Sequence, residues 1–228
     1  MTLPCMILAA GFGTRMGALT ADRPKPLIPV AGRALIDHAL AQADGAGATP
    51  LVVNGHYHAD QMLAHLAGHR ATFLEERPDI LDSGGGVKNA LAVLGTGPVF
   101  TLNADAVWRG PNALRTLLAG WEPTRMGALL LMVPQARATG RHGGGDFAMD
   151  AGGGLRRDKG GAVYTGAQII DARIITDWPG RVFSLRDIWQ GLIDQGRLYG
   201  VDYPGHWADV GHPAGIALAE MMLEAHDV

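Results

Sequence analysis

The chain has 228 residues, which is enough for one substantial α/β domain and short for two. Its 19 basic and 22 acidic residues give a net charge of −3, which argues against broad nucleic-acid binding because such binding normally needs a basic surface. No apolar run approaches a membrane span, and no basic segment with an apolar signal core opens the chain, so we expect a cytoplasmic protein. The single cysteine, Cys5, excludes an intrachain disulfide and is expected to pack inside a strand.

The first predicted element is a buried strand over residues 5–10, and it runs directly into a glycine-rich loop. Two glycines there let the backbone approach a polyphosphate and point N–H groups at it. Arg15 adds a forked cation, and Lys25 adds a point charge fixed between two prolines. Met16 stands where a dinucleotide fingerprint needs glycine, and no P-loop pattern follows, so this is a nucleotide loop of another kind. Its candidate ligands are Ala10, Gly11, Gly13, Thr14, Arg15 and Lys25.

Short apolar strands then alternate with helices, which is typical of right-handed βαβ units and a mainly parallel sheet flanked by helices. Ligands of such sheets bind at the carboxyl ends of the strands, so the site should be a row of loops at one edge. The predicted strands are 51–54, 72–74, 98–102 and 127–133, and the predicted helices are 34–43, 59–66, 111–118, 184–193 and 214–223.

A triplet of glycines at 84–86 precedes another predicted helix. Glycines that enter a helix can offer free N–H groups and room for a flat ring, so we expect Gly84 and Gly85 to lie against a nucleobase or ribose. A plain flexible loop is the alternative.

The predicted strand 98–102 delivers Asp105 at its carboxyl end, beside the phosphate loop. A carboxylate in that place is suited to hold a Mg²⁺ ion that bridges triphosphate oxygens. The alternative is an aspartate that only caps a turn or a helix.

The segment Leu-Ala-Ala-Gly-Phe-Gly-Thr-Arg-Met from Leu8, followed by Pro-Lys-Pro-Leu from Pro24, resembles the opening of the sugar-1-phosphate nucleotidyltransferases. The resemblance implies a Rossmann-like fold and Mg²⁺ held by two carboxylates, Asp105 and the Asp209 of a Trp-Ala-Asp-Val-Gly segment. The family usually has a basic residue and proline where this chain has Gly17-Ala18, and Ala104 replaces the glycine of the usual Asn-Gly-Asp. Arg-Met-Gly also resembles the molybdopterin nucleotidyltransferases, but those place their lysine only a few residues further on.

Beyond residue 133 the pattern changes to short strands broken by glycines, typical of a small antiparallel insertion over a sugar pocket. We expect one domain with a nucleotide-binding half, about 1–110, and a sugar-binding half, about 111–228. The same resemblance implies sugar-phosphate contacts in this half, although Lys159 is followed by Gly160 where the family has proline, and a solvated lysine is an equal alternative. The implied contact residues are Gly145, Asp146, Lys159, Thr165 and Gly166.

The implied reaction joins a nucleoside triphosphate to a sugar 1-phosphate and releases pyrophosphate. Arg15 and the loop backbone would hold the β- and γ-phosphates while Lys25 meets the α-phosphate. The compact length, the Gly-Gly-Gly segment at 84–86 and the Gly-Asp-Phe segment at 145–147 most resemble the N-acetylmuramate 1-phosphate uridylyltransferases. This resemblance implies UTP as the donor and N-acetylmuramate 1-phosphate as the acceptor. Mannose 1-phosphate with GTP, cytidylyl or molybdopterin transfer, and a noncatalytic nucleotide-sugar sensor are the alternatives. Oligomeric state is not predicted.

Overall fold

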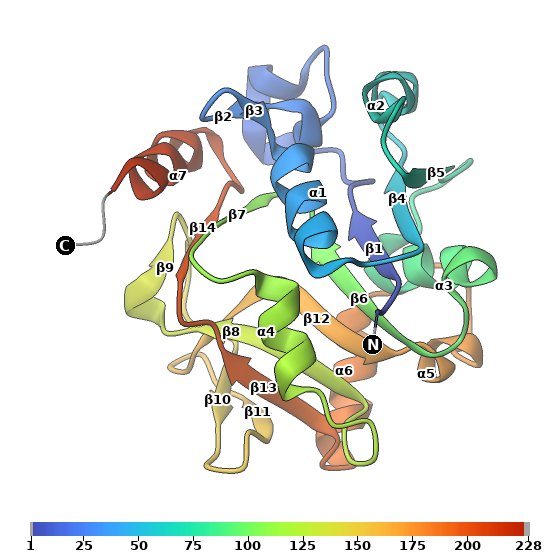
Figure 1. The fold of residues 1–228 in the computed structure, drawn as a ribbon, viewed down its shortest axis with the longest axis vertical. Helices are drawn as coiled ribbons and strands as arrows, with labels where there is room; N and C mark the ends of the chain where they lie inside the picture. The colour runs from blue at the N-terminus through green and yellow to red at the C-terminus, as the bar shows by residue number, and fades with distance from the viewer. Residues whose placement is uncertain (1, 226–228) are drawn as a thin grey trace.

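The computed structural model describes residues 2–225, and its centre is a seven-stranded sheet (Figure 1). Neighbouring strands of this sheet are parallel except where β12 pairs antiparallel with β6 and with β8. In spatial order the strands are β13 (Leu198–Asp202), β8 (Ala128–Val133), β12 (Val163–Asp171), β6 (Pro98–Asn103), β1 (Cys5–Leu8), β4 (Leu51–Gly55) and β5 (Ala71–Glu75). The predicted mainly parallel α/β sheet is confirmed.

Helices cover both faces of the sheet because its central strands are apolar on both sides. In β1, Cys5 and Ile7 pack toward α1, α2 and α4, while Met6 packs toward α3, α5 and α6. Figure 1 looks onto the face that α1 and α4 cover. The helices are α1 (Leu35–Ala46), α2 (Ala59–Leu66), α3 (Asp82–Leu94), α4 (Ala113–Gly120), α5 (Arg173–Thr176), α6 (Leu185–Asp194) and α7 (Pro213–Glu224).

A second, three-stranded sheet brings two distant parts of the chain together. Its strands are β7 (Ala106–Arg109), β14 (His206–Asp209) and β9 (Ala138–Thr139). Asp209 lies opposite Ala106 in the antiparallel β14–β7 pair, and the Val210 amide donates to the Asp105 carbonyl at 2.9 Å. This pairing places the two predicted metal carboxylates side by side at the edge where β6 ends.

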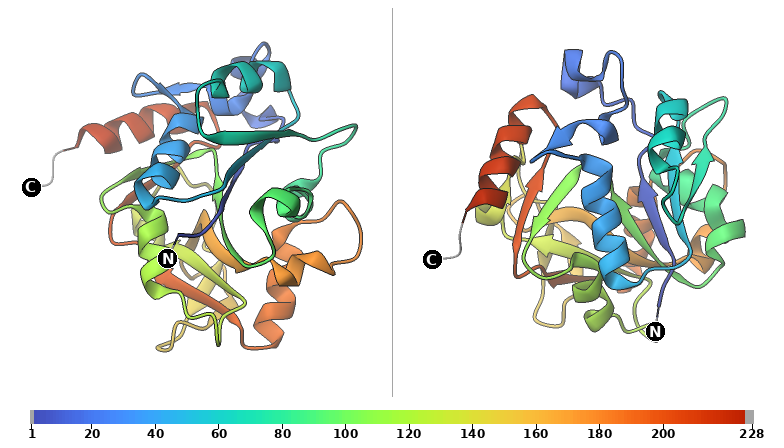
Figure 2. Two further views of the ribbon diagram at one scale, coloured as in Figure 1. Left: turned by 45° about the vertical axis from the view of Figure 1, so that its right-hand side comes forward. Right: turned by 45° about the horizontal axis from the view of Figure 1, so that its top comes forward.

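Helix α7 packs on this small sheet, on the opposite side of the molecule from α3, α5 and α6 (Figure 2). The apolar contacts there include Met16, Val107, Val210 and Met222. The phosphate loop and the last helix therefore share a packed cluster. Among residues 2–225, no helix combines the length and apolar character needed to cross a membrane.

The predicted antiparallel insertion is smaller than expected. It consists of the hairpin β10 (Phe147–Met149) and β11 (Leu155–Arg157). Residues 163–170, expected as part of this insertion, instead form β12 inside the central sheet, where Ile169 and Ile170 are fully buried on opposite faces. The remaining short elements are β2 (Pro29–Val30), β3 (Arg33–Ala34) and the 3-10 turns η1 (Thr14–Thr20), η2 (Lys25–Leu27) and η3 (Gln135–Arg137).

Candidate active site

The glycine loop leaves β1 and folds back on Lys25. Gly13 has a left-handed backbone with φ of 65°, and a Cβ at this position would lie 2.7 Å from the Cβ of Lys25, so only glycine fits. Gly11 has open space where its Cβ would be. Gly17, where the family has a basic residue, also has a positive φ of 58°. Glycine in place of the family's basic residue is therefore explained by a backbone conformation that favours glycine.

A cavity of about 310 Å³ opens above this loop at the carboxyl ends of β1 and β6. It collects the whole predicted phosphate-binding set together with one predicted metal carboxylate. The predicted residues that line it are Ala10, Gly11, Gly13, Thr14, Arg15, Lys25 and Asp105.

A second cavity of about 400 Å³ adjoins the first. Six residues line both cavities, and Arg15 and Asp105 are among them. Of the residues predicted for the sugar half, Asp146, Thr165 and Gly166 line the second cavity, together with the metal candidate Asp209. The structure therefore places an arginine and two carboxylates where two ligands would meet.

The charges at this junction are closely coupled. The Lys25 ammonium donates to the Asp105 carboxylate at 2.7 Å, and the Lys25 side chain is only 9% exposed. Burial, followed by the nearby charge of Asp105, raises the pKa of Asp209 above its usual range, while Lys25, Arg15 and Arg141 oppose the rise. Bringing two carboxylates together costs free energy that a bound divalent cation offsets. Carboxylate oxygens are also the ligands that hard cations prefer, so the pair fits the predicted metal.

Gly84 and Gly85, predicted to offer free N–H groups to a nucleobase or ribose, line neither cavity, and residues 84–86 are not the flexible loop of the alternative either. Gly84 and Gly85 lie within the first turn of α3, and both of their N–H groups donate to the Phe183 carbonyl, at 3.0 and 3.1 Å. A Cβ on Gly84 would overlap the Phe183 ring, and one on Gly85 would overlap the Arg181 carbonyl. The glycines let α3 approach the 181–183 segment. The neighbouring Asp82 and Ser83, rather than the glycines, line both cavities.

Two residues predicted to contact the sugar phosphate lie outside both cavities. Lys159 is exposed, and its carbonyl accepts a hydrogen bond from the Gly145 amide at 2.8 Å. Gly145 is buried against the backbone of Gly161, which leaves no room for a Cβ. Neither residue lines the second cavity. Gly145 therefore shapes the turn that presents Asp146, and the exposure of Lys159 agrees with the alternative of a solvated lysine.

Asp146, Thr165 and Gly166 line the second cavity, and their contacts fix the shape of its wall. The Thr165 hydroxyl donates to the Leu131 carbonyl at 2.8 Å and is buried. Gly166 has a φ of 84°, and a Cβ there would lie within 3 Å of the Asn103 side chain. Asp146 forms an ion pair with Arg141 at 3.1 Å and accepts the Tyr164 amide at 3.0 Å. These contacts fix where β12 bulges away from its neighbours.

Several cavity residues could not be identified from the sequence. Asn54 and Glu76 form a buried pair in the first cavity, where Asn54 donates to Glu76 at 2.7 Å and accepts the Ala9 amide at 2.7 Å. Arg141 and Trp189 line the second cavity. Only Asn54 could have been suspected from the sequence, because it is a polar residue at the end of the apolar run of a predicted strand. The others come from a loop and a helix face that the sequence pattern assigns to turns and packing.

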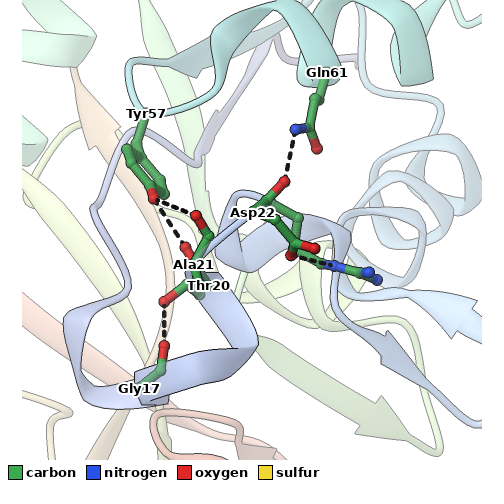
Figure 3. A network of polar contacts seen from close by, with 7 residues as sticks. Gly17, Thr20, Ala21, Asp22, Tyr57 and Gln61 are labelled. Atoms are coloured by element: carbon green, nitrogen blue, oxygen red, sulfur yellow. Dashed lines mark hydrogen bonds and ion pairs between the residues drawn. The ribbon is translucent and has the colours of Figure 1, made fainter.

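The phosphate loop is tied to the start of α2 by a set of hydrogen bonds (Figure 3). The Tyr57 hydroxyl donates to the Thr20 carbonyl at 2.9 Å, and the Gln61 amide donates to the Asp22 carbonyl at 2.8 Å. The Thr20 hydroxyl in turn donates to the Gly17 carbonyl at 3.2 Å. We call Tyr57 and Gln61 the α2 latch. It holds the far end of the loop whose near end forms the first cavity.

The fold is that of known nucleotidyltransferases. HddC from Yersinia pseudotuberculosis, solved as a complex with GMP-PN, superposes with a TM-score of 0.78 over 96% of this chain and 99% of that one, at 20% identity. Residues 5–223 match the model of the MobA-like NTP transferase domain, and the chain belongs to this family of nucleotidyltransferases.

The N-acetylmuramate alpha-1-phosphate uridylyltransferase of Caulobacter vibrioides is 42% identical over 96% of both chains. A mannose-1-phosphate guanyltransferase of Pichia angusta is 29% identical, and the match covers 91% of this chain but 60% of that relative. The chain is therefore an enzyme of the sugar-1-phosphate nucleotidyltransferase class.

Proposed function

We propose that this enzyme transfers a uridylyl group from UTP to N-acetylmuramate 1-phosphate and releases pyrophosphate. The observation that carries the proposal is the junction of the two cavities at Arg15 and Asp105. A donor in the first cavity and an acceptor in the second would meet there with their phosphates beside Lys25. The choice of this substrate pair is supported by the 42% identity with the Caulobacter relative, which extends over 96% of both chains.

Beside its four carboxylates, Asp82, Asp105, Asp146 and Asp209, the second cavity offers guanidinium groups to an acidic acceptor. It is lined by Arg141 and Arg186, and the Nε atom of Arg141 is buried without a hydrogen-bond partner among the described residues. The indole of Trp189 supplies an apolar face, as sugar rings require. N-Acetylmuramate 1-phosphate carries both a carboxylate and a phosphate, and guanidinium groups bind either in a forked geometry.

The reaction needs mainly positive charge that stabilises the phosphates and the leaving pyrophosphate. A sugar phosphate oxygen is already ionised near pH 7, so its attack on the α-phosphorus of UTP requires no general base. As the bond to the bridging oxygen breaks, negative charge gathers on the leaving pyrophosphate. Lys25 meets the α-phosphate, and Arg15 with the loop N–H groups holds the departing phosphates. Each group stands at the cavity junction or in the first cavity.

Asp105 and Asp209 would hold Mg²⁺ in this scheme, because their paired carboxylates offer the oxygen ligands that it prefers. When bound, the ion supplies charge that neutralises the phosphates of the nucleotide. Lys25 already bonds Asp105 and would share that carboxylate with the ion.

A substrate panel tests the proposal. The protein is incubated with Mg²⁺, each of the four nucleoside triphosphates and a set of sugar 1-phosphates, and the nucleotide sugars are identified by mass spectrometry. We expect UDP-N-acetylmuramate as the main product. GDP-mannose as the main product would move the assignment to the guanylyltransferases, and no product with any pair would support a sensor. A fluorescent fusion would test the expected cytoplasmic location.

A further inference from the structure

A second group of metal-binding side chains lies away from the cavities, between α1 and α2. Asp37 belongs to the first turn of α1, His65 to the last turn of α2, and His69 follows that helix. His65 Nε2 lies 2.7 Å from Asp37 Oδ1, and the imidazoles of His65 and His69 are nearly parallel, with an interplanar angle of 15°. One ligand atom of each residue lies within 4.8 Å of the others.

The surroundings leave room for an ion and define its class. The three side chains line a hollow of about 270 Å³ whose rim includes Arg33 and Asp44. Asp44 is paired with Arg70 at 2.9 Å, whereas exposed Arg33 donates to the Asp37 carbonyl at 3.0 Å. Two imidazoles and one carboxylate suit a borderline transition metal such as Zn²⁺ better than Mg²⁺, which prefers oxygen alone. The positive charge of Arg33 lowers the affinity of the site for a cation, but its side chain does not cover the ligand atoms of Asp37, His65 or His69.

We propose that Asp37, His65 and His69 bind one Zn²⁺ ion, with water in the fourth position. Tetrahedral Zn²⁺ places its ligand atoms about 3.4 Å apart, given metal–ligand distances of about 2.0–2.1 Å. The His65–Asp37 pair would open slightly from its hydrogen bond, and exposed His69 would close in by a rotamer change. The side chain of His69 is free to make this change because it lies on the surface.

The ion would join α1 to α2, two helices on the same face of the central sheet. Zn²⁺ that binds the folded state and not the unfolded chain stabilises the fold by mass action. Gln61 of the α2 latch lies in the first turn of the same helix, so the latch would hold one end of α2 and the ion the other. This site is independent of the proposed reaction, since none of its residues lines either active-site cavity.

Calorimetric titration with Zn²⁺ tests the site, using protein that carries no histidine tag and has been stripped of metal. The background is an Asp105→Asn, Asp209→Asn variant in excess Mg²⁺, so that the active-site carboxylates cannot bind the added Zn²⁺. We expect one equivalent to bind with a Kd on the order of micromolar, and His69→Ala or Asp37→Asn to weaken binding at least about tenfold. Exposed His206, on β14, provides the matched control, and His206→Ala should bind as before.

Thermal melting in EDTA checks that each variant is folded, and melting with Zn²⁺ should show a higher Tm only where the site is intact. Absence of binding would overturn the proposal. So would binding that His69→Ala and Asp37→Asn both leave unchanged, or that His206→Ala removes. Activity of the unsubstituted enzyme is not used as a readout, so these results stand apart from the substrate assignment.

Discussion

Lys25 is one of three lysines in the chain, and the other two lie outside both active-site cavities. Its ammonium is nearly buried and reaches the Asp105 carboxylate, so removing it takes positive charge from the junction where phosphates would meet. We expect Lys25→Ala to lower kcat by about 10²-fold or more, as for other preorganised electrostatic groups. Pyrophosphate release under saturating substrates measures the loss, and circular dichroism checks the fold.

Lys159→Ala is the matched comparison for this experiment. Lys159 is exposed and lies outside the second cavity, so we expect kcat/KM to stay within about fivefold of the unsubstituted enzyme. A loss as large as that of Lys25→Ala would return Lys159 to the sugar-phosphate site that the sequence pattern implied.

Asp209 should make the metal-free enzyme less stable as the pH rises. Its raised pKa means that the folded state resists ionising this carboxyl more than the unfolded chain does. This lowers the stability of the folded state. The loss is absent below the unfolded pKa of about 3.9, where the carboxyl is protonated in both states, and it reaches its full size above the folded pKa. We therefore expect Asp209→Asn to be inactive and yet to melt at a higher Tm than the unsubstituted protein in EDTA at pH 7, with the gain vanishing near pH 4.

Asp171→Asn should behave in the opposite way. Burial raises the pKa of Asp171, but the hydrogen bonds and charge of Arg173 outweigh burial and hold it below its usual range. Its ionised form stabilises the fold, so the substitution should lower the Tm at pH 7. If Asp209→Asn lowered the Tm as Asp171→Asn does, the electrostatic account of Asp209 would be wrong.

The α2 latch ties the end of η1 and the residues that follow it to the start of α2. Tyr57 holds the carbonyl groups of Thr20 and Ala21 at 2.9 and 3.3 Å, beyond the glycines that shape the nucleotide loop. Tyr57→Phe removes these bonds and keeps the ring, so we expect the KM for UTP to rise by about fivefold, with kcat changed less. Tyr199→Phe on β13, outside both active-site cavities, should leave the KM unchanged. Equal effects of the two substitutions would contradict a positioning role.

Helix α3 shows how far the sequence pattern alone could be followed. Three consecutive glycines indicate a break in local structure, and nothing local predicts that Phe183 and Arg181, about 100 residues later, would pack onto them. Tertiary packing thus overrides helix propensity. By contrast, the predicted helix 59–66 is confirmed at both ends, because its apolar spacing alone determines which face is buried.

This explanation of the glycines predicts unequal effects of alanine. Gly84→Ala would place a methyl group against the Phe183 ring and should lower the free energy of unfolding by about 1–3 kcal/mol. Gly191→Ala in α6 meets no neighbouring atom and should raise it by about 0.5–1 kcal/mol, since alanine favours helix. Urea unfolding of both variants gives the comparison, and a stabilised Gly84→Ala would refute the packing role.

Across the whole molecule, the two halves predicted from the sequence contribute to the same sheet. β6 of the first half pairs with β12 of the second, and β7 pairs with β14. We propose that the chain folds as one cooperative unit, since neither half keeps its sheet intact alone. Calorimetric and van't Hoff enthalpies of unfolding should agree, and two separate transitions would contradict the proposal.

The alternation of apolar runs predicted five of the seven strands of the central sheet, but it did not predict β13 and it assigned β12 to the insertion. The loop motifs pointed to the phosphate-binding part of the first cavity. The second cavity could be predicted only in part, because Arg141, Trp189 and the bulge at Gly166 meet through long-range pairing. Pairing of β7 with β14 also explains why Asp105 and Asp209 lie together, which spacing in the sequence does not indicate. Ala104 fits where the family has glycine because its backbone is not left-handed.

The dependence of pyrophosphate release on the acceptor tests the central claim most directly. The initial rate is measured with UTP and Mg²⁺, first alone and then with saturating N-acetylmuramate 1-phosphate. Because the two cavities meet at Arg15 and Asp105, we predict rapid release only when both substrates are present, with UDP-N-acetylmuramate formed in equal amount. Release at the same rate without the acceptor, or no release with it, would contradict the account.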